Sequence, residues 1–154
     1  MGKLSTSLIA ATLVLLVLLV LLALPAVAQD YAGVVKTSKG NAAVERAGTQ
    51  VALKPGFQLS QGDRIVTGNN GYVGMTMRDD TLLTLGPGSS LSLDGYAFDA
   101  KTHDGNFLAS LSRGMLSVVT GLIAKRSPDS FVVKTRISTM GVRGTEFIIE
   151  ANEE

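Results

Sequence analysis

The chain of 154 residues contains no cysteine, no tryptophan and a single histidine, His103. Without cysteine the protein has no disulfide framework, so its stability must come from a hydrophobic core. One histidine leaves only carboxylates to complete a zinc site, which argues against a zinc centre. Aromatic residues make up 5% of the chain, so few side chains are available to stack on nucleobases or sugars.

An excess of charge of one sign is also absent. Lysine and arginine number 14, and aspartate and glutamate number 13. Lys3 is the one charged residue in positions 1–28, so positions 29–154 are balanced. Nonspecific binding of nucleic acid requires clustered positive charge that neutralises phosphates, and a balanced domain does not supply it.

A targeting segment opens the chain. Lys3 is followed by a run from Leu8 to Leu24 that is apolar except for Thr12, and Pro25 separates this run from the small residues Ala26-Val27-Ala28. This order is typical of a signal peptide and predicts cleavage after Ala28. Residues 29–154 would then form one exported domain in the periplasm or outside the cell. Because the apolar segment approaches the roughly 20 residues that span a bilayer, an uncleaved inner-membrane anchor is the alternative.

Short runs of alternating apolar and polar residues recur from Ala32 onward, and turn residues close each run. Val73, Met75 and Met77 alternate with smaller or polar residues until Asp79-Asp80 interrupts them. This period of two is typical of half-buried strands. Further strands are expected at 51–53, 83–85, 91–93, 115–119, 131–135 and 146–151.

No stretch after Ala32 shows the apolar spacing of an amphipathic helix, and 17 glycines suit frequent tight turns. Strands without intervening helices pair mostly antiparallel, because parallel pairs need long crossovers. The sequence therefore predicts an all-β fold, an antiparallel sandwich of the jelly-roll kind. A β-solenoid is the alternative, since short strands punctuated by glycine also suit stacked coils.

The longest polar interruption runs from Asp94 to Asn106 and predicts an exposed loop or the tip of an extended hairpin. His103 is the one base available to a serine–histidine–carboxylate triad, but no nucleophile-elbow motif accompanies it. The aspartates could offer oxygen ligands to calcium, yet they lack the spacing of a known calcium loop. We therefore expect no catalytic residue, no metal and no cofactor, and keep Asp99, His103 and Asp104 as candidate binding residues.

Basic residues become more frequent toward the C-terminal half. Lys134 and Arg136 are two positions apart in an expected strand, so they should emerge on one face of the sheet. Such a face could bind a polyanion or an anionic lipid head group, and a merely solvated sheet surface is the alternative.

Two glycine-containing motifs suggest architectural roles. Asp63 follows Gly62 and precedes an apolar strand, so its carboxylate can accept backbone N–H groups and fix a turn. Gly141 and Gly144 flank Val142-Arg143, which suggests a bulge or a close backbone approach. Arg143 could then pair with a carboxylate, and Asp63 is a candidate partner.

Six segments follow one another in a recognisable order, and they are Gly33-Val34-Val35, Ala43 to Arg46, Gly62 to Gly68, Leu83 to Leu91, Gly114-Met115-Leu116 and Thr139 to Phe147. This order resembles that of the FecR-like periplasmic domain. The resemblance implies mainly structural roles for the motif residues Gly62, Asp63, Gly68, Gly141, Arg143, Gly144 and Thr145.

The resemblance also implies a function. Archetypal members of that family are inner-membrane regulators of siderophore uptake, whose cytoplasmic N-terminal region engages a sigma factor and whose periplasmic domain receives a signal from an outer-membrane transporter. Here only Met1 to Ser7 precede the apolar segment, so we expect no contact with a sigma factor. We expect a non-enzymatic envelope module that binds a protein partner. The alternative is a binder of a small molecule, glycan or envelope polymer through the 94–106 loop.

Overall fold

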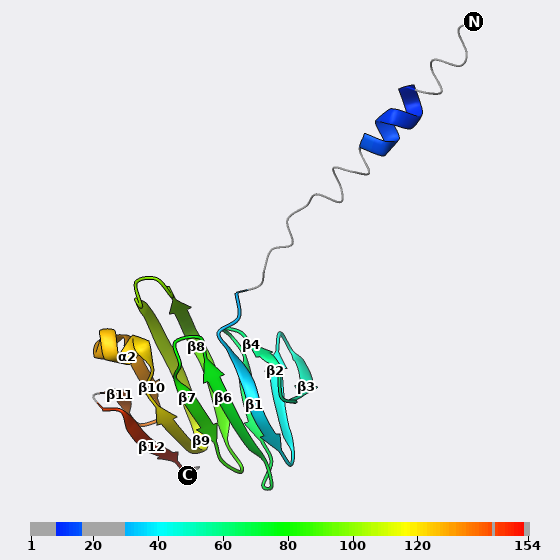
Figure 1. Cartoon of the computed structure of the whole chain (residues 1–154). Coiled ribbons are helices and arrows are strands. Elements are labelled where there is room, and N and C mark those ends of the chain that lie inside the picture. Colours follow the sequence, from blue (N-terminus) through cyan, green and yellow to red (C-terminus); the bar gives the residue numbers. More distant parts are fainter. Residues whose placement is uncertain (1–8, 17–29, 143, 153–154) are drawn as a thin grey trace, which may run out of the picture.

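The computed structural model describes residues 9–16, 30–142 and 144–152 (Figure 1). Residues 9–16 are helical and exposed. The predicted cleavage site after Ala28 lies outside the described residues. In the parts of the chain that the structure describes, no helix has both the length and the apolar character needed to cross a membrane.

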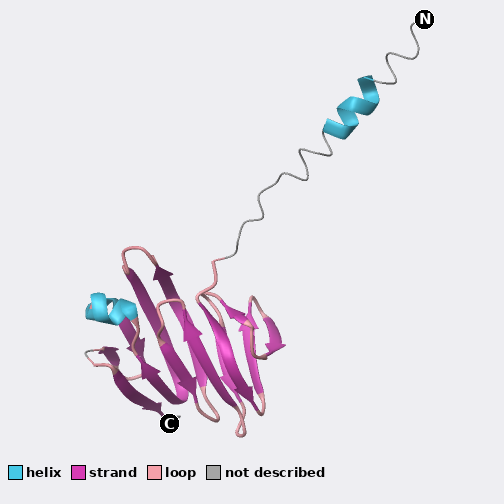
Figure 2. Ribbon diagram, in the orientation of Figure 1, coloured by secondary structure: helices cyan, strands magenta, loops and turns pink. Residues whose placement is uncertain are grey.

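Strands are the dominant elements in residues 30–142 and 144–152 (Figure 2), and the helical elements described there are the short α2 and η1, which confirms the all-β prediction. The elements in chain order are β1 (Gly33–Lys39), β2 (Ala42–Arg46), β3 (Thr49–Ala52), β4 (Gln58–Leu59), β5 (Arg64–Thr67), β6 (Tyr72–Met77), β7 (Leu82–Leu85), β8 (Ser90–Phe98), β9 (Gly105–Val119), α2 (Leu122–Arg126), η1 (Pro128–Ser130), β10 (Phe131–Lys134), β11 (Thr139–Gly141) and β12 (Glu146–Ala151).

The long strand β9 joins two sheets into one curled sheet. Its first part pairs with β8 and β10, and its last part pairs with β7 and β12. One sheet therefore has the order β4-β1-β6-β7-β9-β12, and the other has the order β3-β2-β5-β8-β9-β10-β11. The transition falls at Gly114, which has φ +88° and lies against Ser89, a backbone conformation that glycine adopts at low cost.

Among the described residues, strand pairing is antiparallel in every ladder except β9–β10. This agrees with the expected antiparallel sandwich and disfavours the β-solenoid, whose stacked coils pair in parallel. The short α2 and η1 lie between β9 and β10 and provide the crossover that a parallel pair requires. The sequence did not predict α2, because five residues are too few to show a helical period.

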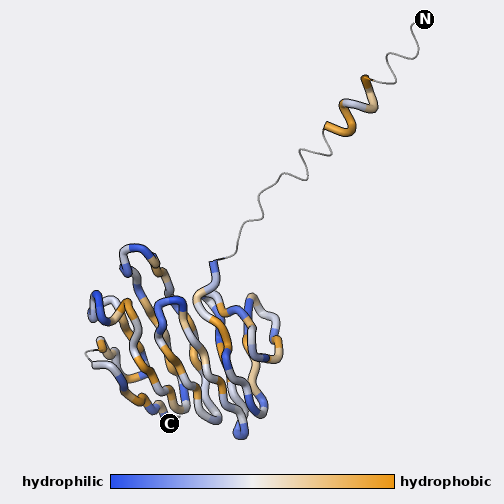
Figure 3. The backbone as a smooth tube through the Cα atoms, viewed as in Figure 1, coloured by the Kyte–Doolittle hydropathy of each residue, from blue (hydrophilic) through white to orange (hydrophobic). Residues whose placement is uncertain are grey.

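The core lies between the two layers and follows the predicted alternation. Val73, Met75 and Met77 of β6 are each at most 2% exposed. Phe107 of β9 stacks on Phe131 of β10 with ring centroids 4.3 Å apart. Hydrophobic and hydrophilic positions follow one another along several strands in Figure 3, and burial alternates along β5, β6 and β7, so these strands turn one face inward and the other to solvent.

Candidate functional site

The segment from Asp94 to Asn106 forms the end of the β8–β9 hairpin, with a six-residue connection between Phe98 and Gly105. The Asp99 carboxylate accepts the backbone N–H groups of Lys101 at 2.7 Å and Thr102 at 3.3 Å. These bonds form an Asx turn, so the carboxylate of Asp99 holds the hairpin connection in shape.

The other two candidates in this connection also have local partners. The ring of His103 stacks on Phe98 at 6.4 Å, and the backbone of His103 has a φ of 61°. Asp104 accepts a hydrogen bond from Arg126 Nε at 3.2 Å, which ties the hairpin to α2. Within the described residues, no group of three histidine or carboxylate side chains could hold a metal ion.

An open pocket lies beside the connecting end of the hairpin. Asp99 and Asp104 line this hairpin pocket, whose volume is about 560 Å³, together with Tyr96, Phe98 and Arg78 among others. His103 is not among its lining residues. The structure therefore brings two of the three predicted loop residues to one pocket.

The basic pair on β10 is not arranged as predicted. Lys134 ends the strand, whereas Arg136 lies in the turn between β10 and β11, so the two do not share a strand face. The turn is closed because Thr135 donates its N–H to the Ser138 carbonyl at 2.8 Å and accepts the Ser138 N–H on its hydroxyl at 3.1 Å. The common-face prediction for Lys134 and Arg136 is therefore wrong, although both side chains are exposed.

The same turn presents an apolar side chain that the sequence reasoning missed. Ile137, at its tip, is 97% exposed. Its signal in the sequence was an isoleucine between arginine and serine, without a strand pattern on both sides. A fully exposed isoleucine leaves apolar surface in water, and its burial against a partner would contribute about 2 kcal/mol.

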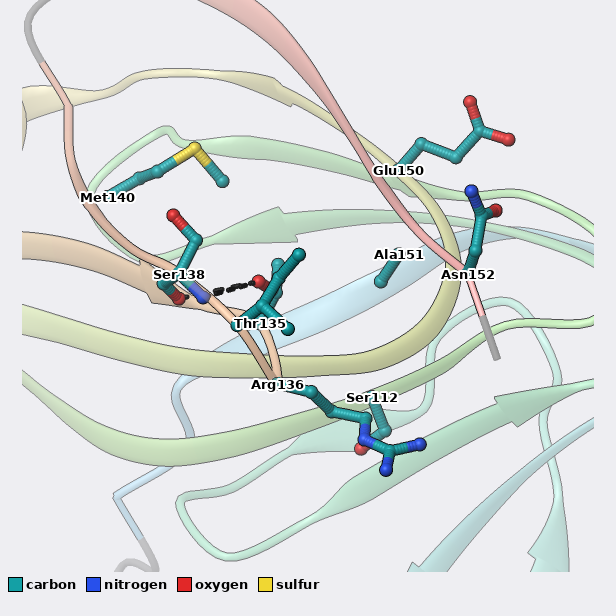
Figure 4. Close-up of a pocket in the computed structure, with 9 residues that line it drawn as sticks. Ser112, Thr135, Arg136, Ser138, Met140, Glu150, Ala151 and Asn152 are labelled. Carbon is teal, nitrogen blue, oxygen red and sulfur yellow. Dashed lines mark hydrogen bonds between the residues drawn. The ribbon is translucent and has the colours of Figure 1, made fainter. Parts of the chain in front are cut away.

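A second pocket lies between the β10–β11 turn and the end of β12 (Figure 4), and we call it the turn pocket. It is open, has a volume of about 350 Å³, and is lined by Ser112, Thr135, Arg136, Ile137, Ser138, Met140, Glu150, Ala151 and Asn152. The β10–β11 turn thus forms one wall and the end of β12 another. The lining combines apolar atoms with one cationic and one anionic side chain, a mixture that suits recognition of a protein surface.

Asp63 is a structural hub. Its side chain is fully buried and accepts the Ser60 N–H at 2.8 Å, next to Gly62 with φ +89°. Arg46 donates Nε and Nη2 to the two carboxylate oxygens at 2.7 Å each. The hydrogen bond to Asp63 raises the pKa of Arg46 above its ordinary value. The partner of Asp63 in the structure is therefore Arg46 of β2, and the candidate partner Arg143 lies outside the described residues.

The C-terminal glycines do not show the expected close approach. A Cβ on Gly141 or Gly144 would meet none of the described atoms within 4 Å, so the close approach is not found, whereas the alternative of a bulge involves Arg143, which lies outside the described residues. The carbonyl of Gly144 accepts the Thr120 hydroxyl at 2.9 Å, and the carbonyl of Thr145 accepts the Thr120 N–H at 2.9 Å. Gly68 is packed more closely, since its Cβ would lie 3.1 Å from Asn41 Cβ.

From the sequence, Asp79 was expected only to end a strand, but in the structure it is a second structural hub. Its buried carboxylate accepts the hydroxyls of Thr81 at 2.7 Å and Tyr96 at 3.3 Å, and the backbone N–H of Ile123 at 3.3 Å. Asp79 thereby caps α2 from the β6–β7 turn. Burial of Tyr96, followed by the charge of Asp79, raises the pKa of Tyr96 above its ordinary value.

Comparison with known proteins gives one match. A family model described as FecR protein matches residues 63–154, which is more than half of the chain. No curated protein and no solved structure matches the chain.

Proposed function

Because the chain belongs to the FecR protein family, we propose that it is a non-catalytic receiving module of the cell envelope that binds a protein partner. The family membership supports a signalling role in general terms. The exported location rests on the signal-like residues 1–28, and the binding role rests on the surface around the turn pocket.

The chemistry of the candidate residues favours recognition over catalysis. Asp99 caps its own turn, Asp104 pairs with Arg126, and Asp63 pairs with Arg46. These carboxylates have structural partners, which leaves them poorly placed to act on a substrate as acid, base or nucleophile.

The single observation that carries the proposal is the 97% exposure of Ile137 beside the turn pocket. Three hydrogen bonds between Thr135 and Ser138 fix the turn that presents this side chain. Hot spots of protein interfaces are apolar anchors near a pocket with a polar rim. Ile137, which the hydrogen-bonded turn keeps in place beside Arg136, matches that description.

The test is capture of an envelope partner by the full chain and by its Ile137→Asp variant. Because the side chain contacts little of its own protein, the variant should keep its unfolding midpoint and bind the partner at least about tenfold more weakly, which corresponds to about 1.4 kcal/mol. Val51→Asp is the matched control, since Val51 is 43% exposed on β3, at the opposite end of the same sheet. Equal capture by wild type and both variants would remove the turn pocket from the proposal.

The hairpin pocket supports a second candidate function. Tyr96 and Phe98 offer ring surfaces there, and Arg78 and Asp99 offer polar groups, a combination that suits a small molecule, a glycan or an envelope polymer. Calorimetric titration with peptidoglycan fragments tests it. Binding that is lost in Phe98→Ala and kept in Ile137→Asp would support this second candidate.

A further inference from the structure

One sheet ends at β12 with an edge that has no partner among the described residues. β12 pairs with β9 along one side, in continuous register from Glu146 opposite Val119 to Ala151 opposite Gly114. The other edge strands, β3, β4 and β11, have four, two and three residues, whereas β12 has six. Natural proteins protect edges with charged side chains, proline or bulges, and β12 has two glutamates but no proline, no lysine and no register shift.

The backbone groups that face outward follow from the hydrogen bonds of β9. Gly86, which directly follows β7, donates its N–H to the Met115 carbonyl at 2.9 Å. The backbone N–H and C=O groups of odd-numbered residues in this part of β9 therefore point toward β7. Thr120 donates its N–H to the Thr145 carbonyl at 2.9 Å, so the backbone N–H and C=O groups of even-numbered residues in this part of β9 point toward β12. In an antiparallel ladder these bonded pairs alternate with unbonded ones.

It follows that Phe147, Ile149 and Ala151 exchange hydrogen bonds with β9, whereas Glu146, Ile148 and Glu150 direct their N–H and C=O groups to the open edge. The side chains of the outward set are exposed, with Ile148 at 65%. The edge therefore offers three donors and three acceptors in a row, beside an exposed isoleucine flanked by two carboxylates.

The charge of this edge selects its partner. Residues 144–154 contain four glutamates and no lysine or arginine. Opposite charges directly across a strand pair stabilise it, and like charges destabilise it. A segment with basic residues opposite Glu146 and Glu150 and an aliphatic residue opposite Ile148 is complementary.

We propose that β12 accepts an extended segment of a partner protein as an added strand, and that this segment carries a basic–x–aliphatic–x–basic pattern. The inference rests on the proposed function only in taking the partner to be a protein. Added strands of this kind gain affinity from main-chain hydrogen bonds and specificity from alternate side chains. Since Glu150, Ala151 and Asn152 also line the turn pocket, the added strand runs toward Ile137.

Pairing of β12 with a second copy of itself is a poorer match. The antiparallel register that uses all three outward residues centres on Ile148 and places Glu146 of each copy opposite Glu150 of the other. Two like-charge pairs then face each other across the new ladder. The edge is therefore arranged against the symmetric dimer that an unprotected apolar strand would otherwise form.

Amide hydrogen exchange followed by NMR on the full chain tests the proposal. The probes are two seven-residue peptides, Thr-Lys-Thr-Ile-Thr-Lys-Thr and its counterpart with glutamate in place of lysine. In the free protein the amides of Glu146, Ile148 and Glu150 should exchange fast, and those of Phe147 and Ile149 slowly. Saturating lysine peptide should slow the three outward amides at least about tenfold, and the glutamate peptide should not.

Two variants separate the backbone from the charge. Ile148→Pro removes one outward N–H without removing a bond to β9, which edge strands tolerate, and should abolish the protection. Ile148→Thr keeps the N–H and should retain it. Glu146→Lys combined with Glu150→Lys leaves the backbone intact and should reverse the preference toward the glutamate peptide.

The alternatives give different results. Equal protection by both peptides, or binding without protection of the three amides, would overturn the proposal, as would concentration-dependent protection without peptide, which indicates self-pairing. In the envelope capture experiment, a partner lost in Ile137→Asp but retained in Ile148→Pro would leave the proposed function standing and refute the β12 assignment. No partner in either variant or in wild type would refute the proposed function, while the peptide experiment would still decide this inference.

Discussion

Replacing Asp63 with asparagine should destabilise the protein by about 3 kcal/mol. The fully buried carboxylate accepts hydrogen bonds from Arg46 Nε and Nη2 at 2.7 Å each and from the Ser60 N–H at 2.8 Å. Breaking a buried ion pair typically costs about 3–5 kcal/mol. The lower end applies here because the side chain of Arg46 is 38% exposed and can regain water.

Urea unfolding followed by circular dichroism measures this loss, as a lower midpoint at unchanged slope. The melting temperature should fall by roughly 12 °C, as expected for about 3 kcal/mol in a domain of about 120 residues. A double-mutant cycle with Arg46→Met should show a coupling energy of about 2 kcal/mol, since the pair acts as a unit.

The pair formed by Glu45 and Arg64 provides the matched control. Its N–O distance is 3.9 Å and its side chains are 43% and 50% exposed, so Glu45→Gln should cost less than about 1 kcal/mol. If Asp63→Asn lowers the free energy of unfolding no more than Glu45→Gln does, Asp63 is not a structural hub.

Three further predictions follow from the packing around Asp79 and from the surface. Gly121→Ala should lower the free energy of unfolding in urea by more than about 3 kcal/mol, because its Cβ would clash with the Asp79 carbonyl oxygen. Gly141→Ala is the control and should lower it by less than about 1 kcal/mol, since no described atom lies within 4 Å of its Cβ. Similar losses for both variants would contradict the geometry. As pH rises above about 10, Tyr96 loses its proton in the unfolded chain but keeps it in the folded protein, so the free energy of unfolding should fall. Tyr96→Phe should reduce this fall when unfolding is measured as a function of pH. If the fall with pH is the same in the variant, Tyr96 is not its source. Ile137→Ser should leave the free energy of unfolding in urea within about 0.5 kcal/mol of the wild-type value, because the side chain is 97% exposed. A larger loss would mean that Ile137 packs against its own chain.

Most of the strands that the sequence predicted alternate in burial residue by residue, although β3 is exposed throughout. Val73, Met75 and Met77 face the core in turn, and β12 occupies residues Glu146 to Ala151 as expected. Alternation is a local signal that burial on one face imposes directly. The fold class could therefore be predicted from the sequence.

The failures concern features that depend on distant parts of the chain. α2 has five residues, and it is held by Asp79 from a turn 44 positions before Ile123. Arg46 and Asp63 are 17 positions apart. Neither partnership leaves a periodic pattern, because tertiary contacts bring the residues together.

The turn between β10 and β11 was missed for a different reason. It contains no glycine or proline, the residues that mark most turns, and Thr135 and Ser138 close it through their own hydrogen bonds. The strand therefore ends at Lys134, two residues before Arg136. The same error hid Ile137, which the sequence analysis did not consider as a surface residue.

The most direct test of a protein-binding role is site-specific photo-crosslinking in intact cells. A photoreactive amino acid replaces Ile137 in one strain and Val51, at the opposite end of the sheet, in another. We expect a discrete crosslinked protein from position 137 and none from position 51. Absence of a product at 137, or the same product from both positions, would contradict the claim that this surface receives a protein partner.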